Sequence, residues 1–203
     1  TLSGGSATVT GTITSDTGAH DIAITAPATS KMSVDMKGGN DTVRIDTIAA
    51  IHTIAGGEGT DTLRTSTAIS ATTGANISGF ESVRLSAGNA VVLSTTTNTV
   101  AAVRFDATGG SFTGLASGAT VTIPTGGAVT VANAAWTAGT TDSTTVSVGA
   151  STTATGTAIA ATTLTSTGLE TVTINNLALS NNTDARTVGI VDTTATTGSV
   201  KTL

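Results

Sequence analysis

The sequence predicts an all-β fold, an elongated right-handed parallel β-solenoid built from stacked coils. The chain consists largely of Thr, Ala, Ser, Gly and Val, with charged residues at 10% and aromatic residues at 2%. Small residues with β preference suit thin coils that each bury only a few side chains. Strand-like segments also recur at a fixed interval of twenty residues, which is the signature of a repeat architecture. No helical periodicity of useful length appears.

The repeat is clearest between residues 21 and 105, where successive segments place apolar residues at alternate positions. Since side chains alternate between the two faces of a strand, one inward column is predicted at Val43, Leu63, Val83 and Val103. A second inward column is predicted at Ile45, Leu85 and Phe105, with Thr65 as the exception. The residues between these columns are predicted to form an outward ladder of Arg44, Arg64, Arg84 and Arg104.

The opposite side of each coil is less regular. An opening strand is expected near residues 7–9, and the inward candidates further along are Met32, Val34, Ile51 and Ile54. The turn before each strand predicts a column of small residues at Ala19, Gly39, Gly59 and Gly79. Glycine is needed at such a place if φ is positive or if another group approaches the backbone closely.

The composition changes after Asp106, which suggests two regions. Residues 1–106 are predicted to form a regular solenoid with twenty-residue coils, and residues 107–203 a charge-poor β continuation rich in Thr, Ala and Gly. Strand-like alternation in the second region appears at residues 120–123, 129–131, 146–148, 172–174, 188–190 and 200–203. Its irregular spacing is compatible with a less regular solenoid or with a small β-sandwich.

Composition also limits the function. A net charge of −5 without a basic stripe disfavours nucleic acid as a partner. No apolar run reaches the length that spans a membrane, so no membrane insertion is expected. Cysteine and tyrosine are absent and neither histidine has a nucleophile near it in a persuasive pattern, so we expect no enzyme. The chain lacks a starting Met and a secretory signal, which is typical of a processed or excised piece.

The acidic residues before the strands are the candidate site. Asp21, Asp41, Asp61 and Glu81 are equally spaced, so stacked coils would place them in line. Calcium prefers six to eight oxygen ligands from carboxylates, carbonyls and water, and glycine turns expose carbonyls. Unneutralised, each neighbouring pair of carboxylates would cost about 3 kcal/mol at a distance of about 5 Å, and a cation would remove that cost.

The competing interpretation is that these acids only cap turns, because Asp and Asn favour turns in any case. Calcium is preferred for the complete pattern at residues 56–63, in register with Gly38-Gly39-Asn40-Asp41. Both interpretations stay open for Asp21, and capping is preferred for Glu81. The arginine ladder has two interpretations as well: it covers a sheet face and pairs with Asp46 or Asp106, or it contacts a neighbouring subunit or an acidic polysaccharide.

The segment Gly56-Gly57-Glu58-Gly59-Thr60-Asp61-Thr62-Leu63 resembles the nonapeptide repeat of RTX proteins, which bacteria export by type I secretion. Gly38-Gly39-Asn40-Asp41 resembles a partial copy. Two segments, at residues 79–85 and 168–174, resemble a unit common in RTX-type S-layer proteins of Gram-negative bacteria. The resemblance implies Ca²⁺ bound by Gly39, Asp41, Gly57, Gly59 and Asp61, with Asp21 as a further candidate. The twenty-residue interval departs from the family's nine, so few ions are expected, on one side only.

The predicted function is therefore structural: a segment of a secreted protein on the bacterial cell surface that self-associates into a two-dimensional S-layer lattice or a homo-oligomer. An alternative is an RTX adhesin or matrix module that recognises a surface polysaccharide or another cell, although aromatic residues for such a groove are almost absent. Ice binding by threonine ladders, and a stalk of a phage or secreted enzyme, are less favoured.

Overall fold

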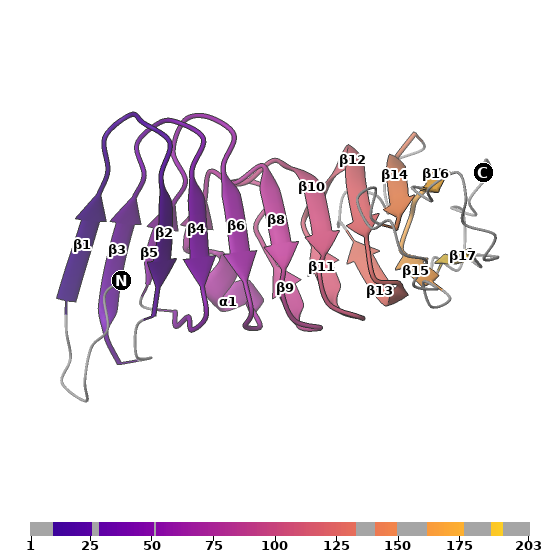
Figure 1. Cartoon of the computed structure of the whole chain (residues 1–203), viewed down its shortest axis with the longest axis horizontal. Helices are drawn as coiled ribbons and strands as arrows, with labels where there is room; N and C mark the ends of the chain where they lie inside the picture. The colour runs from indigo at the N-terminus through magenta and orange to yellow at the C-terminus, as the bar shows by residue number, and fades with distance from the viewer. Residues whose placement is uncertain are drawn as a thin grey trace.

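The structure is a computed structural model that describes residues 10–25, 29–50, 52–132, 141–149, 162–176 and 188–192. Its coils stack along one long axis, as Figure 1 shows, and form a parallel β-solenoid of about six turns. The predicted all-β parallel solenoid is confirmed. The predictions at residues 7–9, at Ile51 and at residues 200–203 lie outside the described residues.

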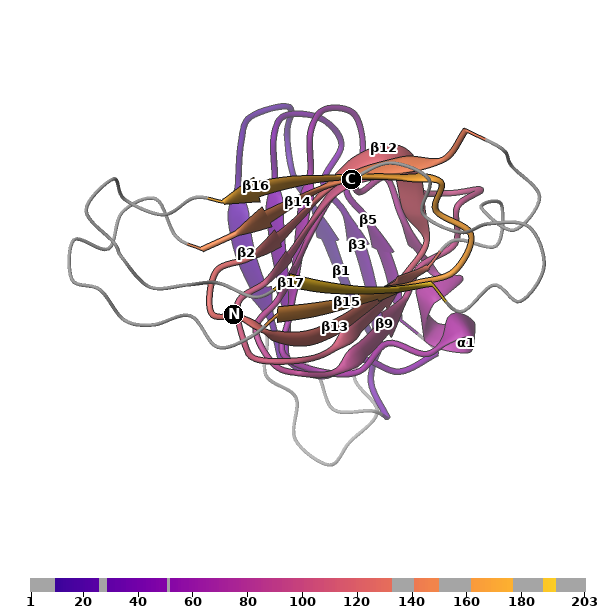
Figure 2. The same ribbon diagram turned by 90° about the vertical axis from the view of Figure 1, so that its right-hand side faces the viewer.

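One sheet runs along the whole stack, and we call it the long sheet. Its strands, in spatial order, are β2 (Asp21–Ile24), β4 (Thr42–Ile45), β6 (Thr62–Thr65), β8 (Ser82–Leu85), β10 (Val100–Phe105), β12 (Leu115–Ile123), β14 (Ser143–Val148) and β16 (Thr171–Asn176). Viewed along the stack in Figure 2, the strands rotate from upright at β2 to nearly horizontal at β16, as the inherent twist of β-structure requires.

Two shorter sheets close the coils. The N-terminal sheet contains β1 (Thr10–Thr14), β3 (Lys31–Asp35), β5 (Thr53–Ala55) and β7 (Ile77–Ser78). The C-terminal sheet contains β9 (Ala90–Val92), β11 (Ser111–Thr113), β13 (Gly127–Ala132), β15 (Thr162–Ser166) and β17 (Val188–Asp192). A short helix, α1 (Ala71–Gly74), lies before β7, and Ser70 caps it by accepting the Thr73 N–H.

The core consists of side-chain columns that cross the sheets. Both predicted inward columns of the long sheet are buried, and the arginines between them point outward. Thr65 fits an apolar column because its hydroxyl donates to the Thr67 carbonyl oxygen at 2.9 Å and accepts the Thr67 N–H at 3.1 Å. Met32, Val34 and Ile54 are buried as predicted. Gly11 makes room for Met32, whose sulfur lies 3.1 Å from where a Cβ would stand.

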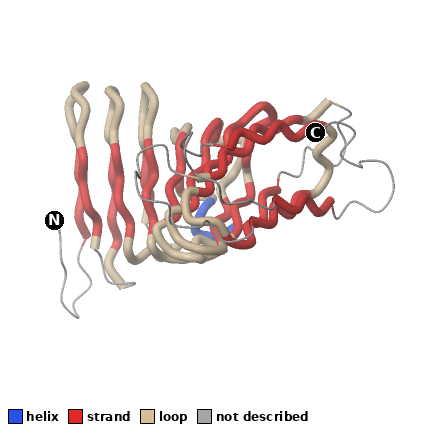
Figure 3. The backbone as a smooth tube through the Cα atoms, turned by 45° about the vertical axis from the view of Figure 1, so that its right-hand side comes forward, coloured by secondary structure: helices blue, strands red, loops and turns tan. Residues whose placement is uncertain are grey.

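The twenty-residue period conceals a change of coil shape. Seven positions separate Ile54 from Asp61, whereas four separate its column partner Ile77 from Glu81. The three missing residues reappear on the other side of the coil, where α1 is inserted before Ile77. Figure 3 shows the result: the first three coils carry tall turns, and the turns described in the following coils are lower. We call these the tall turns, residues 15–20, 36–41 and 56–61.

The second half continues as the same solenoid. β10 pairs with β12 in parallel, and Val103, Val121 and Val146 share one inward column. The irregular spacing reflects turns of unequal length rather than a different architecture. Of the two alternatives left open by the sequence, the described residues therefore follow the less regular solenoid, and the long sheet runs on without a break across Asp106.

Candidate metal centre

The acidic side chains stand where each tall turn enters the long sheet. There the N–H of the residue before each strand faces the next coil. The backbone of that next coil turns at a glycine and offers no carbonyl oxygen to this N–H. A carboxylate from that next coil supplies the missing acceptor. Asp61 Oδ1 accepts the Asp41 N–H at 2.7 Å, and Glu81 Oε2 accepts the Asp61 N–H at 2.9 Å. Asp41 Oδ1 accepts the His20 N–H at 2.7 Å. We call Asp41, Asp61 and Glu81 the acid column.

These acids do cap backbone N–H groups, as the capping interpretation expected. Capping accounts for only one oxygen of each aspartate. Asp41 is 1% exposed and Asp61 is fully buried. Their second oxygens, Oδ2 in both cases, are buried without a hydrogen-bond partner. A buried carboxylate oxygen without a donor carries an uncompensated desolvation cost, so a proton or a cation is the natural partner for it.

Asp61 has the least favourable environment for a charge. Burial raises the pKa of Asp61 above its ordinary value, and the negative charges of Asp41 and Glu81 raise it further. The hydrogen bond from the Asp41 N–H opposes this rise but does not cancel it. The folded chain therefore favours a neutralised Asp61, because the charged form is both desolvated and flanked by like charges.

The motif glycines are required by backbone stacking. Gly39, Gly57 and Gly59 have φ angles of 115°, 106° and 133°, which other residues rarely adopt. A Cβ on Gly59 would stand 1.8 Å from the Gly39 carbonyl oxygen, and one on Gly57 would stand 2.2 Å from the Lys37 carbonyl oxygen. The carbonyl oxygens of Lys37 and Gly39 therefore face the next coil.

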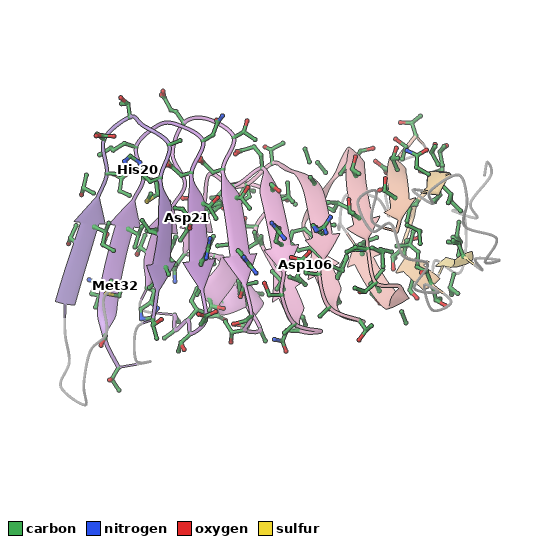
Figure 4. All side chains as sticks on the ribbon, viewed as in Figure 1. His20, Asp21, Met32 and Asp106 are labelled. Carbon is green, nitrogen blue, oxygen red and sulfur yellow. The ribbon has the colours of Figure 1, made fainter. Side chains whose placement is uncertain are left out.

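The first coil is one residue longer than predicted. Asp21 pairs with Thr42 rather than with Asp41, so the placement of Asp21 in the acid column is wrong by one position. His20 occupies that place, and its Nδ1 lies 3.2 Å from Asp41 Oδ1. Asp21 is exposed instead and forms an ion pair with Arg44. Figure 4 shows His20 at the level of the tall turns and Asp21 on the strand layer.

The predicted turn column is also corrected. Gly18, not Ala19, places its carbonyl oxygen against Gly39, 2.5 Å from the position of a Cβ. Gly79 does not continue the column of Gly59, because the shortened turn of its coil places it against Gly57. The predicted pair of Gly39 and Gly59 is brought together. Turn length, which sequence spacing does not reveal, decides these alignments.

Sequence reasoning missed a second acid pair of the same kind. Glu170 Oε2 accepts the Asp142 N–H at 2.8 Å, and the Glu170 N–H donates to the Asp142 carbonyl oxygen at 3.0 Å. Asp61 and Glu81 make the same two bonds, at 2.9 and 3.2 Å. Asp142 Oδ2 is likewise buried without a partner. The similarity of residues 168–174 to 79–85 is the signal, but the interval of 28 residues hides the partner.

A second missed residue, Asn98, holds the shortened turn of the fourth coil. Its side-chain oxygen accepts the Phe80 N–H at 3.1 Å, and its amide donates to the carbonyl oxygens of Ile77 at 2.8 Å and Ser94 at 3.1 Å. Asn98 is buried, so its side chain satisfies backbone groups of the turn that water cannot reach. A lone Asn in a Thr-rich loop gives no sequence signal for this role.

The residues fit a calcium ion in part. The second oxygens of Asp41 and Asp61 are buried and have no hydrogen-bond partner, and carboxylate oxygens are the ligands that a hard cation prefers. In the part of the chain that the structure describes, however, no three His, Cys, Asp or Glu side chains converge on one point. Any further ligands there would have to be backbone carbonyls or water. Of the predicted carboxylates, Asp41 and Asp61 are stacked and Asp21 is not, while the Lys37 carbonyl oxygen accepts the Glu58 N–H at 2.8 Å and the Gly39 carbonyl oxygen faces Gly59.

The fold and the acid column define the class of protein: a parallel β-solenoid with stacked, backbone-capping carboxylates. Comparisons of the chain with protein-family models, with curated proteins and with solved structures find no match. No helix within the described ranges is long and apolar enough to cross a membrane. The functional assignment therefore depends on the geometry of this chain.

Proposed function

We propose that the chain is a structural segment of a secreted bacterial surface protein, a solenoid that calcium stiffens and that self-associates into an S-layer lattice. The observation that carries the proposal is the pair of buried, unpartnered oxygens on Asp41 and Asp61. Two like charges on adjacent coils, flanked by Glu81, disfavour the stacked state unless something neutralises them. A divalent cation from the external medium would do so.

In this proposal the two aspartates would hold the ion through Oδ2 while Oδ1 continues to cap the neighbouring coil. The ion would supply positive charge and no reaction chemistry. Its effect is to tie the second and third coils together, so that the solenoid resists bending and unwinding. A stiff segment with a repeated surface suits a lattice, where each contact recurs in every copy.

The test is a calcium titration of the whole chain. Calcium is expected to raise the thermal unfolding midpoint and to promote ordered particles, and a chelator is expected to reverse both. Circular dichroism follows folding, and electron microscopy follows the particles. The double variant Asp41→Asn/Asp61→Asn should lose calcium uptake in calorimetry, whereas the exposed control Asp46→Asn should retain it. Equal uptake by the double variant and the control would refute the site.

A further inference from the structure

The outward face of the long sheet carries a line of arginines. Register pairs Arg44 with Arg64, Arg64 with Arg84 and Arg84 with Arg104, one on each of four adjacent strands. We call these four residues the arginine stripe. It holds half of the eight basic residues of a chain whose net charge is −5. Strands in a sheet lie about 4.8 Å apart, so the stripe concentrates like charges that repel one another.

The chain does not fully neutralise the stripe. Arg44 pairs with Asp21, and Arg84 and Arg104 share Asp106, at 2.8 and 2.5 Å. Among the residues that the structure describes, Arg64 donates only to the Ser86 hydroxyl, at 3.0 Å. Burial alone would raise the pKa of Asp106, but the hydrogen bonds and charges of Arg104 and Arg84 lower it. Asp46, beside the stripe, accepts from the Ser66 hydroxyl at 2.6 Å, which leaves four arginines against three carboxylates.

The tall turns carry the opposite charge. Asp16 is 82% exposed and Glu58 is exposed, while Asp35 is matched by Lys37 at 2.7 Å. Asp16 and Glu58 lie in the tall turns and Asp35 ends β3, so the turns themselves carry two exposed acids and one lysine, with His20 Nε2 3.3 Å from Asp16 Oδ1. In Figure 1 the tall turns project from one edge of the stack, away from the strand layer that bears the stripe. One molecule can thus use both surfaces at once.

The two surfaces also match in spacing. Asp16 belongs to the first coil and Glu58 to the third, and Arg64 and Arg104 are likewise two coils apart. Both pairs are therefore separated by about 10 Å along the stack. The first and third turns can therefore place Asp16 and Glu58 opposite two arginines in the stripe of another molecule, while Lys37 on the second turn stays paired with Asp35.

We propose that the arginine stripe is the docking surface for the tall turns of a second copy of this chain. The contact joins two different surfaces, so it is heterologous, and where the rotation between copies does not close a ring it extends as a row of a lattice. This inference rests on the proposed self-association and names the two surfaces that form one of the contacts in the lattice. Guanidinium groups suit the role because they bind carboxylates with two parallel hydrogen bonds.

Two charge-reversed chains test the pairing. Arg64→Glu removes the arginine of the stripe that binds no acid within the described ranges, and Glu58→Arg reverses the charge of the turn. Each variant alone should require at least about a tenfold higher concentration to assemble, because like charges then face each other. Mixed in equal amounts, the two variants should assemble again. The new carboxylate on the stripe of one variant then meets the new guanidinium on the turn of the other, and the unchanged Arg64 and Glu58 meet at the alternate contacts. Sedimentation velocity and electron microscopy, in calcium and at low salt, give the readout.

The control is Lys31→Glu, an equal charge change on the exposed face of the N-terminal sheet, which should assemble like the wild type. Circular dichroism establishes that all chains fold. If the wild type assembles and Arg64→Glu assembles equally well, the stripe is not an interface and only this inference fails. If both variants fail and mixing restores nothing, the stripe faces another surface or a polyanion, and the pairing is refuted. A wild type that never assembles refutes the proposed function as well.

Discussion

Replacing Asp61 by Asn separates the two roles of the acid column. Asn keeps an oxygen that can accept the Asp41 N–H, now at 2.7 Å, and removes the buried charge. At an effective dielectric constant near 20, each neighbouring carboxylate at about 5 Å contributes about 3 kcal/mol of repulsion. The new amide places two donors where the Asp61 Oδ2 has no partner, which costs about 1–3 kcal/mol. The two repulsions together, about 6 kcal/mol, exceed the cost of the amide, so in chelator at pH 7 Asp61→Asn should stabilise the chain by about 3–5 kcal/mol.

The pH dependence has a definite sign. The pKa of Asp61 is raised in the folded chain, first by burial and then by Asp41 and Glu81, against the hydrogen bond that lowers it. A raised folded pKa means that the contribution of Asp61 to stability is fully present below its ordinary pKa and is lost as pH rises through the folded value. The wild type in chelator should lose this contribution from about pH 4 upward, and Asp61→Asn should not.

Urea unfolding followed by circular dichroism, in chelator and in calcium, measures both effects. Calcium should stabilise the wild type in proportion to the logarithm of its concentration and should leave Asp61→Asn unchanged. The exposed control Asp46→Asn should stay within about 0.5 kcal/mol of the wild type. If Asp61→Asn is less stable than the wild type in chelator at pH 7, the carboxylate is not repelled by its neighbours, and the reasoning about the acid column is wrong.

Three further predictions concern the coil backbone. Gly59→Ala should cost about 3 kcal/mol or more, because its Cβ would stand 1.8 Å from a carbonyl oxygen at a φ of 133°. The control is Gly118→Ala, which should cost about 1–2 kcal/mol because Gly118 has a φ of 77° but open space around it. Equal urea midpoints for the two variants would contradict the stacking argument. Lys37→Gly should leave the stability unchanged or raise it by up to about 1 kcal/mol, since it relieves a φ of 65° and loses only a half-exposed ion pair. A clearly lower thermal unfolding midpoint would contradict this. Asn98→Ala should cost about 2–4 kcal/mol because two buried hydrogen bonds and one partly buried hydrogen bond are lost. Asn98→Asp, which still accepts the Phe80 N–H but no longer donates, should also destabilise, and a neutral result for both would exclude the proposed role.

The acid column connects the sequence motif to a physical need. Parallel coils pair along their strands, but the turns between them vary in shape, so the N–H of Asp41, of Asp61 and of Asp142 is bound by a side chain of the next coil rather than by its backbone. Asp61 and Glu81 fill this place in the first half, and Glu170 fills it in the second. The motif therefore has a structural reason before any ion is considered. Calcium, in our proposal, relieves the charge that this capping buries.

The sequence by itself determined the solenoid, its inward columns and its outward arginines. A strand alternates its side chains, and the segments around Val43, Leu63, Val83 and Val103 keep one period. Their direction therefore follows from spacing alone. The pairing of Asp41 with Asp61 followed for the same reason, because both the period and the turn length are constant between those coils.

The tertiary structure decided every feature that depends on turn length. Hydrogen-bond register, not sequence interval, placed His20 rather than Asp21 beside Asp41. It also joined Asp142 to Glu170 across 28 residues. A turn can gain or lose residues without disturbing the strands that it connects, so equal spacing in the sequence does not guarantee equal position in the stack. The chain thus specifies its coils locally, and only their packing specifies which acids meet.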